Sequence, residues 1–193
     1  MPEKILLVAT GNAGKLAEIK SILADFRVIG AKEAGIDFDA EETGTTFKEN
    51  AAIKARELKK LTEHAVLADD SGLCVDALGG APGVYSARYA GDNATDDENV
   101  DKLLSALQDV PEESRGAQFQ SVVCLITAEG EELYGVGSCS GQILFERAGS
   151  GGFGYDPVFF SEDFGKSFGV LTHEQKNQIS HRKRALSDLL TKL

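Results

Sequence analysis

Apolar and polar positions alternate along the chain in blocks that predict short strands and amphipathic helices. An apolar run over 5–9 predicts a buried strand, and apolar residues at 16, 19 and 23 then recur at the spacing of one helical face. Thr46 and Glu49 have the spacing of a capping box, so we expect a second helix to begin there. The buried stripe of that helix would consist of Phe47, Ala51, Ala55 and Leu58.

The middle of the chain adds a strand, an irregular segment and a third helix. The apolar run 65–68 predicts a buried strand, whereas 69–91 is so rich in glycine and turn residues that we expect a long, functional loop. Thr95 and Glu98 repeat the capping-box spacing. The apolar face of the helix that follows would be Val100, Leu103, Leu104 and Leu107.

The last third of the chain begins with a β pattern. Alternation between 117 and 144, with a turn at Glu129 and Gly130, predicts a hairpin. A strand over 158–160 and a closing helix over about 181–190 follow. Helices, hairpin and strands together predict a mixed α/β fold. A chain of 193 residues is expected to form one domain, 1–193. A division of that domain into two closely joined lobes is the alternative.

Composition and charge narrow the class of partner. Hydrophobic residues make up 42% and charged residues 26%, which is typical of a soluble globular protein. A formal net charge of -11 argues against nucleic acid, because proteins bind nucleic acid through clustered Lys and Arg. A small phosphorylated ligand remains compatible, since it needs few cations and a metal that an acidic protein holds well.

Cysteines and the longest apolar runs indicate the compartment. The three cysteines are odd in number and widely spaced, which fits neither a disulfide framework nor a zinc site, so we expect reduced and buried thiols at Cys74, Cys124 and Cys139. The apolar stretch near the N-terminus is too short for a signal peptide, and no other run would span a bilayer. These features predict a cytoplasmic protein without a membrane partner.

The first candidate for chemistry is the segment TGNAGK at 10–15, between a predicted strand and a predicted helix. Unpaired backbone N–H groups and the helix dipole favour an anion at such a place, and phosphate is the natural one. The glycine spacing differs from a P-loop, and Leu16 stands where a P-loop has Ser or Thr. A plain turn in which Thr10 or Asn12 caps the helix is the equally open alternative.

The second candidate is the pair Asp69 and Asp70, followed by a serine and a glycine, at the predicted C-terminal end of a buried strand. Neighbouring side chains on a strand point to opposite faces, so one acid is expected to face a pocket while the other binds locally. The alternative is that both acids cap a turn. Glu42 is the preferred additional Mg²⁺ ligand, whereas Glu49 has a sufficient role in its capping box, and Lys54 is interpreted as solvated.

Two further segments suit a nucleoside. In GGFGYDP at 151–157, Phe153 and Tyr155 would offer flat apolar surfaces to a base, unless they pack into the core. Ser180 is placed to cap the closing helix, with His181 and Arg182 in its first turn. Positive charge is disfavoured there, so Arg182 indicates an acceptor such as the keto oxygen of a base, unless the segment is only a basic surface cluster.

Five motifs in order give a family resemblance: TGNAGK, EETGTTFKENA, ADDSGLCVDALGGAPGVYSARYAG, GGFGYDPVF and SHRKRAL. Together they resemble the inosine and xanthosine triphosphate pyrophosphatases over nearly the whole chain. The resemblance implies an elongated, curved mixed sheet with helices on both sides and two lobes around a central cleft. It also implies a homodimer that removes pyrophosphate from ITP, dITP and XTP and keeps them out of nucleic acid.

The resemblance implies a role for each matching residue. Asp70 would be the catalytic proton acceptor and, with Mg²⁺ as cofactor, a metal ligand beside Glu42. Residues 10–15 would contact the triphosphate, Ser71 the substrate, and the later motifs the nucleoside. The implied substrate-binding residues are Thr10, Gly11, Asn12, Ala13, Gly14, Lys15, Ser71, Phe153, Gly154, Tyr155, Asp156, Lys176, His181 and Arg182.

These roles imply a reaction mechanism, and three alternative functions stay open beside it. Water would attack the α-phosphorus while Asp70 orients or deprotonates it, and Lys15 with the loop amides would hold the leaving pyrophosphate. A donor such as Arg182 accepts hypoxanthine and xanthine and disfavours adenine, although guanine carries the same oxygen. A phosphatase, a pyrophosphatase for modified pyrimidines and a nucleotide-binding regulator without turnover are the alternatives, and product analysis separates them.

Overall fold

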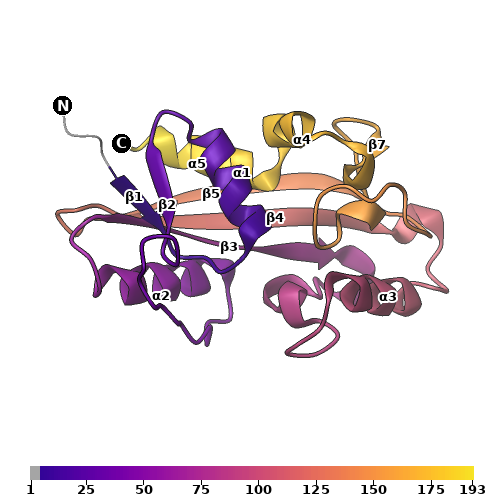
Figure 1. Cartoon of the computed structure of the whole chain (residues 1–193). Coiled ribbons are helices and arrows are strands. Elements are labelled where there is room, and N and C mark those ends of the chain that lie inside the picture. The colour runs from indigo at the N-terminus through magenta and orange to yellow at the C-terminus, as the bar shows by residue number, and fades with distance from the viewer. Residues whose placement is uncertain (1–4) are drawn as a thin grey trace. The chain divides into compact units, whose positions relative to one another are not determined.

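The computed structural model describes residues 5–193 as a mixed α/β protein, as the sequence predicts (Figure 1). Hydrogen-bonded neighbours in its seven-stranded sheet follow the order β2-β1-β3-β4-β5-β6-β7. The chain divides into two compact units. Unit 1 comprises the described residues up to Asp70 with Ser121–Gly137 and Arg182–Leu193, and unit 2 comprises Ser71–Gln120 and Ser138–His181.

Unit 1 has a parallel β edge, since β1 pairs in parallel with both β2 and β3. The capping box of Thr46 and Glu49 starts α2, and Asn12 caps α1 by accepting a hydrogen bond from the Lys15 N–H. The elements that begin in this unit or build it are β1 (Ile5–Val8), α1 (Ala13–Ile22), β2 (Arg27–Gly30), α2 (Phe47–Lys59), β3 (Ala65–Val75), β5 (Glu132–Ile143) and α5 (His181–Leu190).

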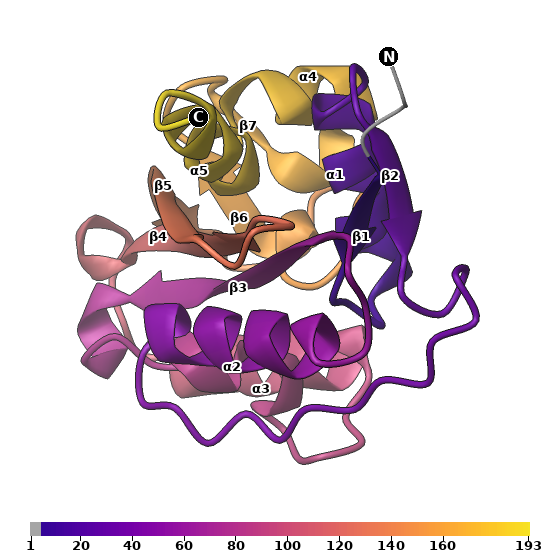
Figure 2. The ribbon, with the colours of Figure 1, turned by 90° about the vertical axis from the view of Figure 1, so that its left-hand side faces the viewer.

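Helices cover both faces of the sheet in unit 1 (Figure 2). On one face, Leu67 of β3 packs in a buried cluster with residues of α1 and α5. On the other face, Val66 and Ala68 pack with three residues of the predicted apolar stripe of α2, namely Ala51, Ala55 and Leu58. Odd-numbered residues at the start of β3 therefore face α1 and α5, and even-numbered residues face α2, as strand alternation requires.

Unit 2 is built around aromatic side chains. Phe119 lies 4.6 Å from Phe159 and 5.8 Å from Phe168 between ring centroids. Arg115 is buried and its guanidinium donates to the carbonyls of Leu107 and Ile143. The elements here are α3 (Asp96–Ala106), β4 (Gly116–Ile126), β6 (Phe159–Ser161), β7 (Lys166–Ser167), α4 (His173–Ile179) and five 3₁₀ turns (Asp76–Leu78, Gly83–Arg88, Glu112–Ser114, Asp156–Val158 and Phe168–Val170).

Most predicted elements are confirmed, and the exceptions are informative. Both capping boxes, the hairpin of β4 and β5 and the closing helix form as predicted. The prediction that a strand ends at 68 and a loop follows is wrong, because β3 continues to Val75. The sequence analysis missed β2, β7 and α4, which are short. None of the three cysteines forms a disulfide, and Cys74 is only half-buried rather than buried.

Candidate active site

Two adjacent acids in the interior of β3 lie at the centre of the candidate site. Asp69 and Asp70 are 1% and 5% exposed. The prediction that these acids lie at the C-terminal end of a strand is wrong, because the strand continues for five residues beyond Asp70. Neither is a turn cap. Their side chains leave opposite faces of the strand, so each acid meets a different set of partners.

Asp69 faces α1 and α5, and Ser121, Lys15 and Arg182 donate to it. Its Oδ1 accepts a hydrogen bond of 2.6 Å from the Ser121 hydroxyl. Its Oδ2 lies 3.0 Å from the Lys15 ammonium and 3.2 Å from the Arg182 guanidinium. Arg182 also forms an ion pair with Glu18 of α1. Asp69 is therefore fixed as part of a buried network of charges.

This network sets the charge of Asp69. Burial by itself would raise the pKa of Asp69, but Arg182 and Lys15 more than offset that effect and hold the pKa well below its usual range. Burial also works against the charge of Arg182, yet Asp69 and Glu18 raise the pKa of its guanidinium. Arg182, at the start of α5, thus has two carboxylates as acceptors, those of Asp69 and Glu18.

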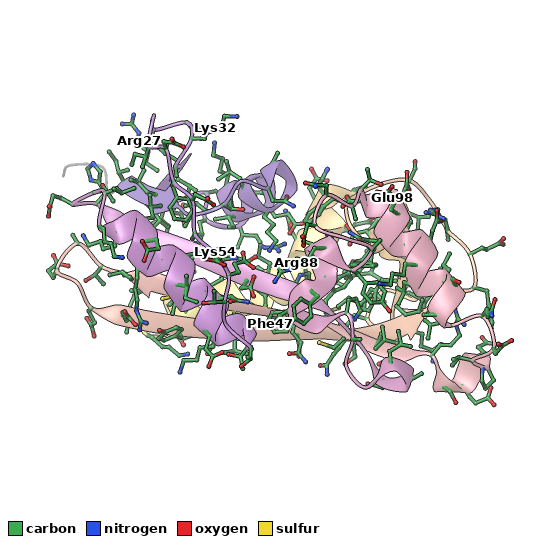
Figure 3. The ribbon with its side chains drawn as sticks, turned by 90° about the horizontal axis from the view of Figure 1, so that it is seen from below. Arg27, Lys32, Phe47, Lys54, Arg88 and Glu98 are labelled. Atoms are coloured by element: carbon green, nitrogen blue, oxygen red, sulfur yellow. The ribbon has the colours of Figure 1, made fainter. Side chains whose placement is uncertain are left out.

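Asp70 faces α2 and has a different environment. The Lys54 ammonium lies 2.9 Å from Asp70 Oδ1 and 2.9 Å from Glu42 Oε1. Figure 3 labels Lys54 on α2, the helix that Phe47 begins. The interpretation of Lys54 as a solvated side chain is wrong, since it is only 9% exposed and joins two carboxylates. Asp70 and Glu42, the two predicted metal ligands, therefore share one cationic partner.

Asp70 is shifted in the opposite direction from its neighbour. Burial raises the pKa of Asp70 above its usual value, and Lys54 and Lys15 only partly offset that rise. Among the described residues 5–193, its buried Oδ2 has no hydrogen-bond partner. Two neighbouring acids whose pKa values are driven apart are typical of a site in which one remains an anion and the other handles a proton.

The segment that carries Glu42 is fastened to α2 by Asn50. The Asn50 side-chain oxygen accepts a hydrogen bond of 2.8 Å from the Gly44 N–H. A Cβ at Gly44 would lie 2.6 Å from that oxygen, so the close approach requires glycine. Asn50 is fully buried, and within the described part of the chain its Nδ2 has no partner. Asn50 therefore helps to position Glu42.

The loop at 10–15 follows β1 and leads into α1. Gly11, Asn12 and Ala13 are exposed, and no acidic residue occupies the first turn of the helix. Asn12 accepts from the Lys15 N–H at 2.9 Å, while the Thr10 hydroxyl accepts from the Asn12 N–H at 3.1 Å. The first turn keeps backbone N–H groups without intrahelical partners. Capping by Asn12 and a site for an anion thus coexist at this loop.

Within unit 2, several residues of the predicted nucleoside side form one cluster. Buried Lys176 of α4 pairs with Asp156 at 2.7 Å, and its ammonium lies 4.5 Å from the centre of the Phe153 ring. Asp156 also accepts from the Phe153 N–H at 3.0 Å. A Cβ at Gly152, where φ is +74°, would lie 2.0 Å from the Asp156 carboxylate. This turn is therefore shaped by Asp156.

The remaining predicted residues of unit 2 are His181, Tyr155, Gly154 and Ser71. The His181 ring stacks on Phe119 with centroids 4.8 Å apart and an interplanar angle of 15°. Tyr155 is buried and its hydroxyl donates to the Ser86 carbonyl at 2.6 Å. The Gly154 N–H donates to Asp96 at 2.7 Å, and Ser71 is half-buried beside Asp70 in the chain. Tyr155 therefore belongs to the core rather than to an open surface.

A divalent metal ion fits the residues around Asp70. Glu42 and Asp70 provide two carboxylates at one place, and the buried Oδ2 of Asp70 is a further acceptor. Over residues 5–193 no group of three or more His, Cys, Asp or Glu side chains is placed to hold a metal. Mg²⁺ commonly takes only one or two protein carboxylates and completes its shell with water and phosphate. The donor set fits a metal that is bound together with a phosphorylated ligand.

Sequence reasoning missed four contributors: Glu18, Asn50, Lys54 and Ser121. A local signal existed for two of them. Asn50 and Lys54 lie at helical spacing between the apolar residues of α2, so they share its buried face. Glu18 and Ser121 are far from their partners in the sequence, and no local pattern identifies them.

Comparisons with known proteins find relatives over nearly the whole chain. The Ham1 family model matches residues 6–192. The chain is 51% identical to a dITP/XTP pyrophosphatase of Salmonella paratyphi A over 195 aligned residues, and this alignment covers 99% of the chain and 98% of the relative. A dITP/XTP pyrophosphatase of Escherichia coli O157:H7 has the same identity and coverage. The Ham1 protein structure from Staphylococcus aureus gives a TM-score of 0.84 at 44% identity, covering 95% of each chain. A HAM1 protein structure from Coxiella burnetii gives 0.85 at 42%, covering 98% and 99%.

Proposed function

The chain belongs to the Ham1 family, and we propose that it hydrolyses non-standard purine nucleoside triphosphates, such as dITP, XTP and ITP, to monophosphate and pyrophosphate. The observation that carries the proposal is the pair of adjacent buried acids with opposite pKa shifts, Asp69 and Asp70, in the unit that also contains the loop at 10–15. Relatives that are 51% identical and are called dITP/XTP pyrophosphatases supply the substrate class.

Asp70 is the general base in this proposal. Its raised pKa makes it a better proton acceptor than an ordinary carboxylate, and its Oδ2 is an acceptor that a water molecule would occupy. Asp69 has a lowered pKa and accepts from Ser121, Lys15 and Arg182, so it remains an anion that orients Lys15 and Arg182. The attacking water would lose its proton to Asp70 as it approaches the α-phosphorus.

Glu42 and Asp70 would hold Mg²⁺ in this reaction. A metal ion bound there would neutralise the negative charge that spreads over the phosphate oxygens. Asn50 holds the Glu42 segment in place through Gly44, so that this carboxylate is ready for its ligand.

The loop at 10–15 would bind the leaving pyrophosphate. Backbone N–H groups in the first turn of α1 and the Lys15 ammonium are suitable donors, because both are fixed before substrate arrives. Lys15 is oriented by its ion pair with Asp69 at 3.0 Å. This preorganisation stabilises the growing charge without rearrangement during the reaction.

In unit 2, Lys176 is the donor that we favour for the keto oxygen of the base. Its ammonium is buried, pairs with Asp156 at 2.7 Å and lies 4.5 Å from the centre of the Phe153 ring, so a fixed cation lies beside a flat aromatic surface. Arg182, to which the sequence analysis gave this role, already binds Asp69 and Glu18. Adenine presents a donor at the same position and would face Lys176 unpaired, which disfavours it by about 1–3 kcal/mol.

The proposal includes a homodimer that acts in the cytoplasm. Three cysteines that form no disulfide accord with a reducing compartment. None of the helices in residues 5–193 is long and apolar enough to cross a bilayer. Light scattering of the purified protein tests the dimer directly, and a monomer at micromolar concentration would contradict that part of the proposal.

A panel of nucleoside triphosphates tests the function. With and without Mg²⁺, ITP, dITP and XTP should release pyrophosphate much faster than ATP, GTP or modified pyrimidine triphosphates. Asp70→Asn should abolish turnover while the circular dichroism spectrum is unchanged, and Asp25→Asn, on an exposed turn, should keep full activity. Orthophosphate as the product would instead indicate a phosphatase, and tight binding without products would indicate a regulator.

A further inference from the structure

We propose that the Lys54 ammonium occupies the divalent-cation position in the free protein and leaves it only when a nucleoside triphosphate binds. The inference rests on the proposed function, because it concerns the metal ion and the substrate of that same site. It assigns Lys54 a role as a positioning residue that makes metal binding conditional on substrate.

The geometry around Lys54 carries the inference. Its ammonium nitrogen lies 2.9 Å from Glu42 Oε1 and 2.9 Å from Asp70 Oδ1, between the two carboxylates that would hold the metal. A Mg²⁺ ion bound to the same oxygens would lie about 2.0–2.1 Å from each. If a metal ion took these two oxygens, its charge and that of the ammonium would lie close together and repel each other. They therefore compete for the same two oxygens.

Lys54 has a strong reason to remain between these carboxylates in the absence of substrate. It projects from the buried face of α2 and is only 9% exposed, so its charge lacks the hydration that a surface lysine has. A buried ammonium requires anionic partners, and Glu42 and Asp70 supply them. A metal ion that entered alone would displace the ammonium without offering it a new acceptor.

A triphosphate changes this balance in two ways. Its oxygens add ligands to the metal ion, which the two carboxylates leave far from saturated, and within residues 5–193 no third acidic, histidine or cysteine ligand completes the group. The same oxygens offer the displaced ammonium a charge-assisted hydrogen bond. Metal and nucleotide should therefore bind with positive coupling, and each should raise the affinity for the other by the same factor.

The first test measures Mn²⁺ binding to the wild-type protein by electron paramagnetic resonance. In the presence of a non-hydrolysable methylene analogue of ITP, Mn²⁺ should bind about tenfold tighter or more, beyond the Mn²⁺ that the analogue binds alone. Equal affinity of the protein for Mn²⁺ with and without the analogue would overturn the inference. This measurement uses no variant, so its outcome does not depend on how a substitution affects folding.

The second test removes the competing charge. Lys54→Met should bind Mn²⁺ roughly ten- to a hundredfold tighter without nucleotide, which corresponds to the loss of a charge-assisted hydrogen bond. Lys60→Met is the matched control, because it removes a lysine at the end of the same helix, and the Lys60 side chain is 65% exposed. This control should change the affinity for Mn²⁺ less than about twofold. Mn²⁺ should also raise the melting temperature of Lys54→Met more than that of the wild type.

A third variant separates competition from a general change in charge. In Lys54→Met with Glu42→Gln, the tighter Mn²⁺ binding should be lost, because one of the two freed oxygens is no longer a carboxylate. Similar tightening in Lys54→Met and Lys60→Met, or no tightening in a folded Lys54→Met, would refute the role of Lys54. Pyrophosphate release from ITP by the wild type would leave the proposed function intact in either case, whereas its absence would contradict the function itself.

Discussion

Replacing Arg182 by Met should strongly destabilise the protein. Arg182 is 1% exposed and lies between Asp69 and Glu18, which are also buried. Methionine has a similar length and no charge, so the substitution keeps most of the packing and leaves two carboxylates without this cation. Breaking a buried ion pair from one side costs about 3–5 kcal/mol. We expect the lower end of that range, because Asp69 keeps Lys15 and Ser121 as partners.

Urea unfolding at pH 7 measures the effect. With a slope of about 2–3 kcal/mol per molar urea, the expected loss moves the midpoint down by about 1–2 M. Arg184→Met, on the exposed side of the same helix, should change the free energy of unfolding by less than about 0.5 kcal/mol. Adding Glu18→Gln to Arg182→Met should recover part of the loss, because it removes one of the two carboxylates that the first substitution leaves behind.

The pH dependence of the loss provides the sharper test. In the wild type the pKa of Asp69 is lowered by Arg182 and Lys15, so its contribution to stability is present above the unfolded-state pKa of about 3.9 and disappears as the pH falls through the folded value. Without Arg182 the pKa of Asp69 should rise, and protonation should relieve the penalty. The difference between wild type and variant should therefore shrink from pH 7 towards pH 4. A loss under about 1 kcal/mol, or one of the same size at both pH values, would refute this reasoning.

Two further predictions use the same site. Asp69→Asn should lower the melting temperature, because the pKa of Asp69 is lowered and its charge stabilises the fold. Asp70→Asn should lower it less, because burial raises the pKa of Asp70, although Lys54 loses one of its two carboxylate partners. Scanning calorimetry checks the contrast, and a larger loss in Asp70→Asn would contradict it. Gly44→Ala should increase the Mg²⁺ concentration needed for half-maximal activity several-fold, since its Cβ would meet Asn50 and displace the segment that carries Glu42. Thr43→Ala, an exposed neighbour, is the control, and equal Mg²⁺ dependence of the two variants would argue against a positioning role.

Local chemistry is what the sequence predicts best in this protein. The capping boxes of α2 and α3 and the β4–β5 hairpin depend on residues within a few positions of each other. The opposite orientation of Asp69 and Asp70 follows from strand alternation, and it is confirmed by their separate partners. These features could be predicted because none of them needs knowledge of the rest of the fold.

Contacts between distant parts of the chain explain what could not be predicted. Ser71 and Gly72 have the composition of a turn, yet pairing with neighbouring strands keeps β3 extended as far as Val75, since tertiary context overrides a weak local preference. Arg182 finds Glu18 at a separation of 164 residues, which no local pattern reveals. Lys54 was misread because lysine is rarely buried unless paired, and both of its partners come from outside its helix.

The alternation of β3 has a consequence for how this protein can change. Because the side-chain period of a strand is two, shifting the strand by one residue moves every side chain to the other layer. Such a shift would give Asp69 the lysine of α2 and Asp70 the arginine of α5, with the composition of the segment unchanged. Which acid reacts is therefore decided by whether its position in the strand is odd or even. A single residue inserted upstream would exchange the roles of Asp69, which pairs with Lys15 and Arg182, and Asp70, the general base.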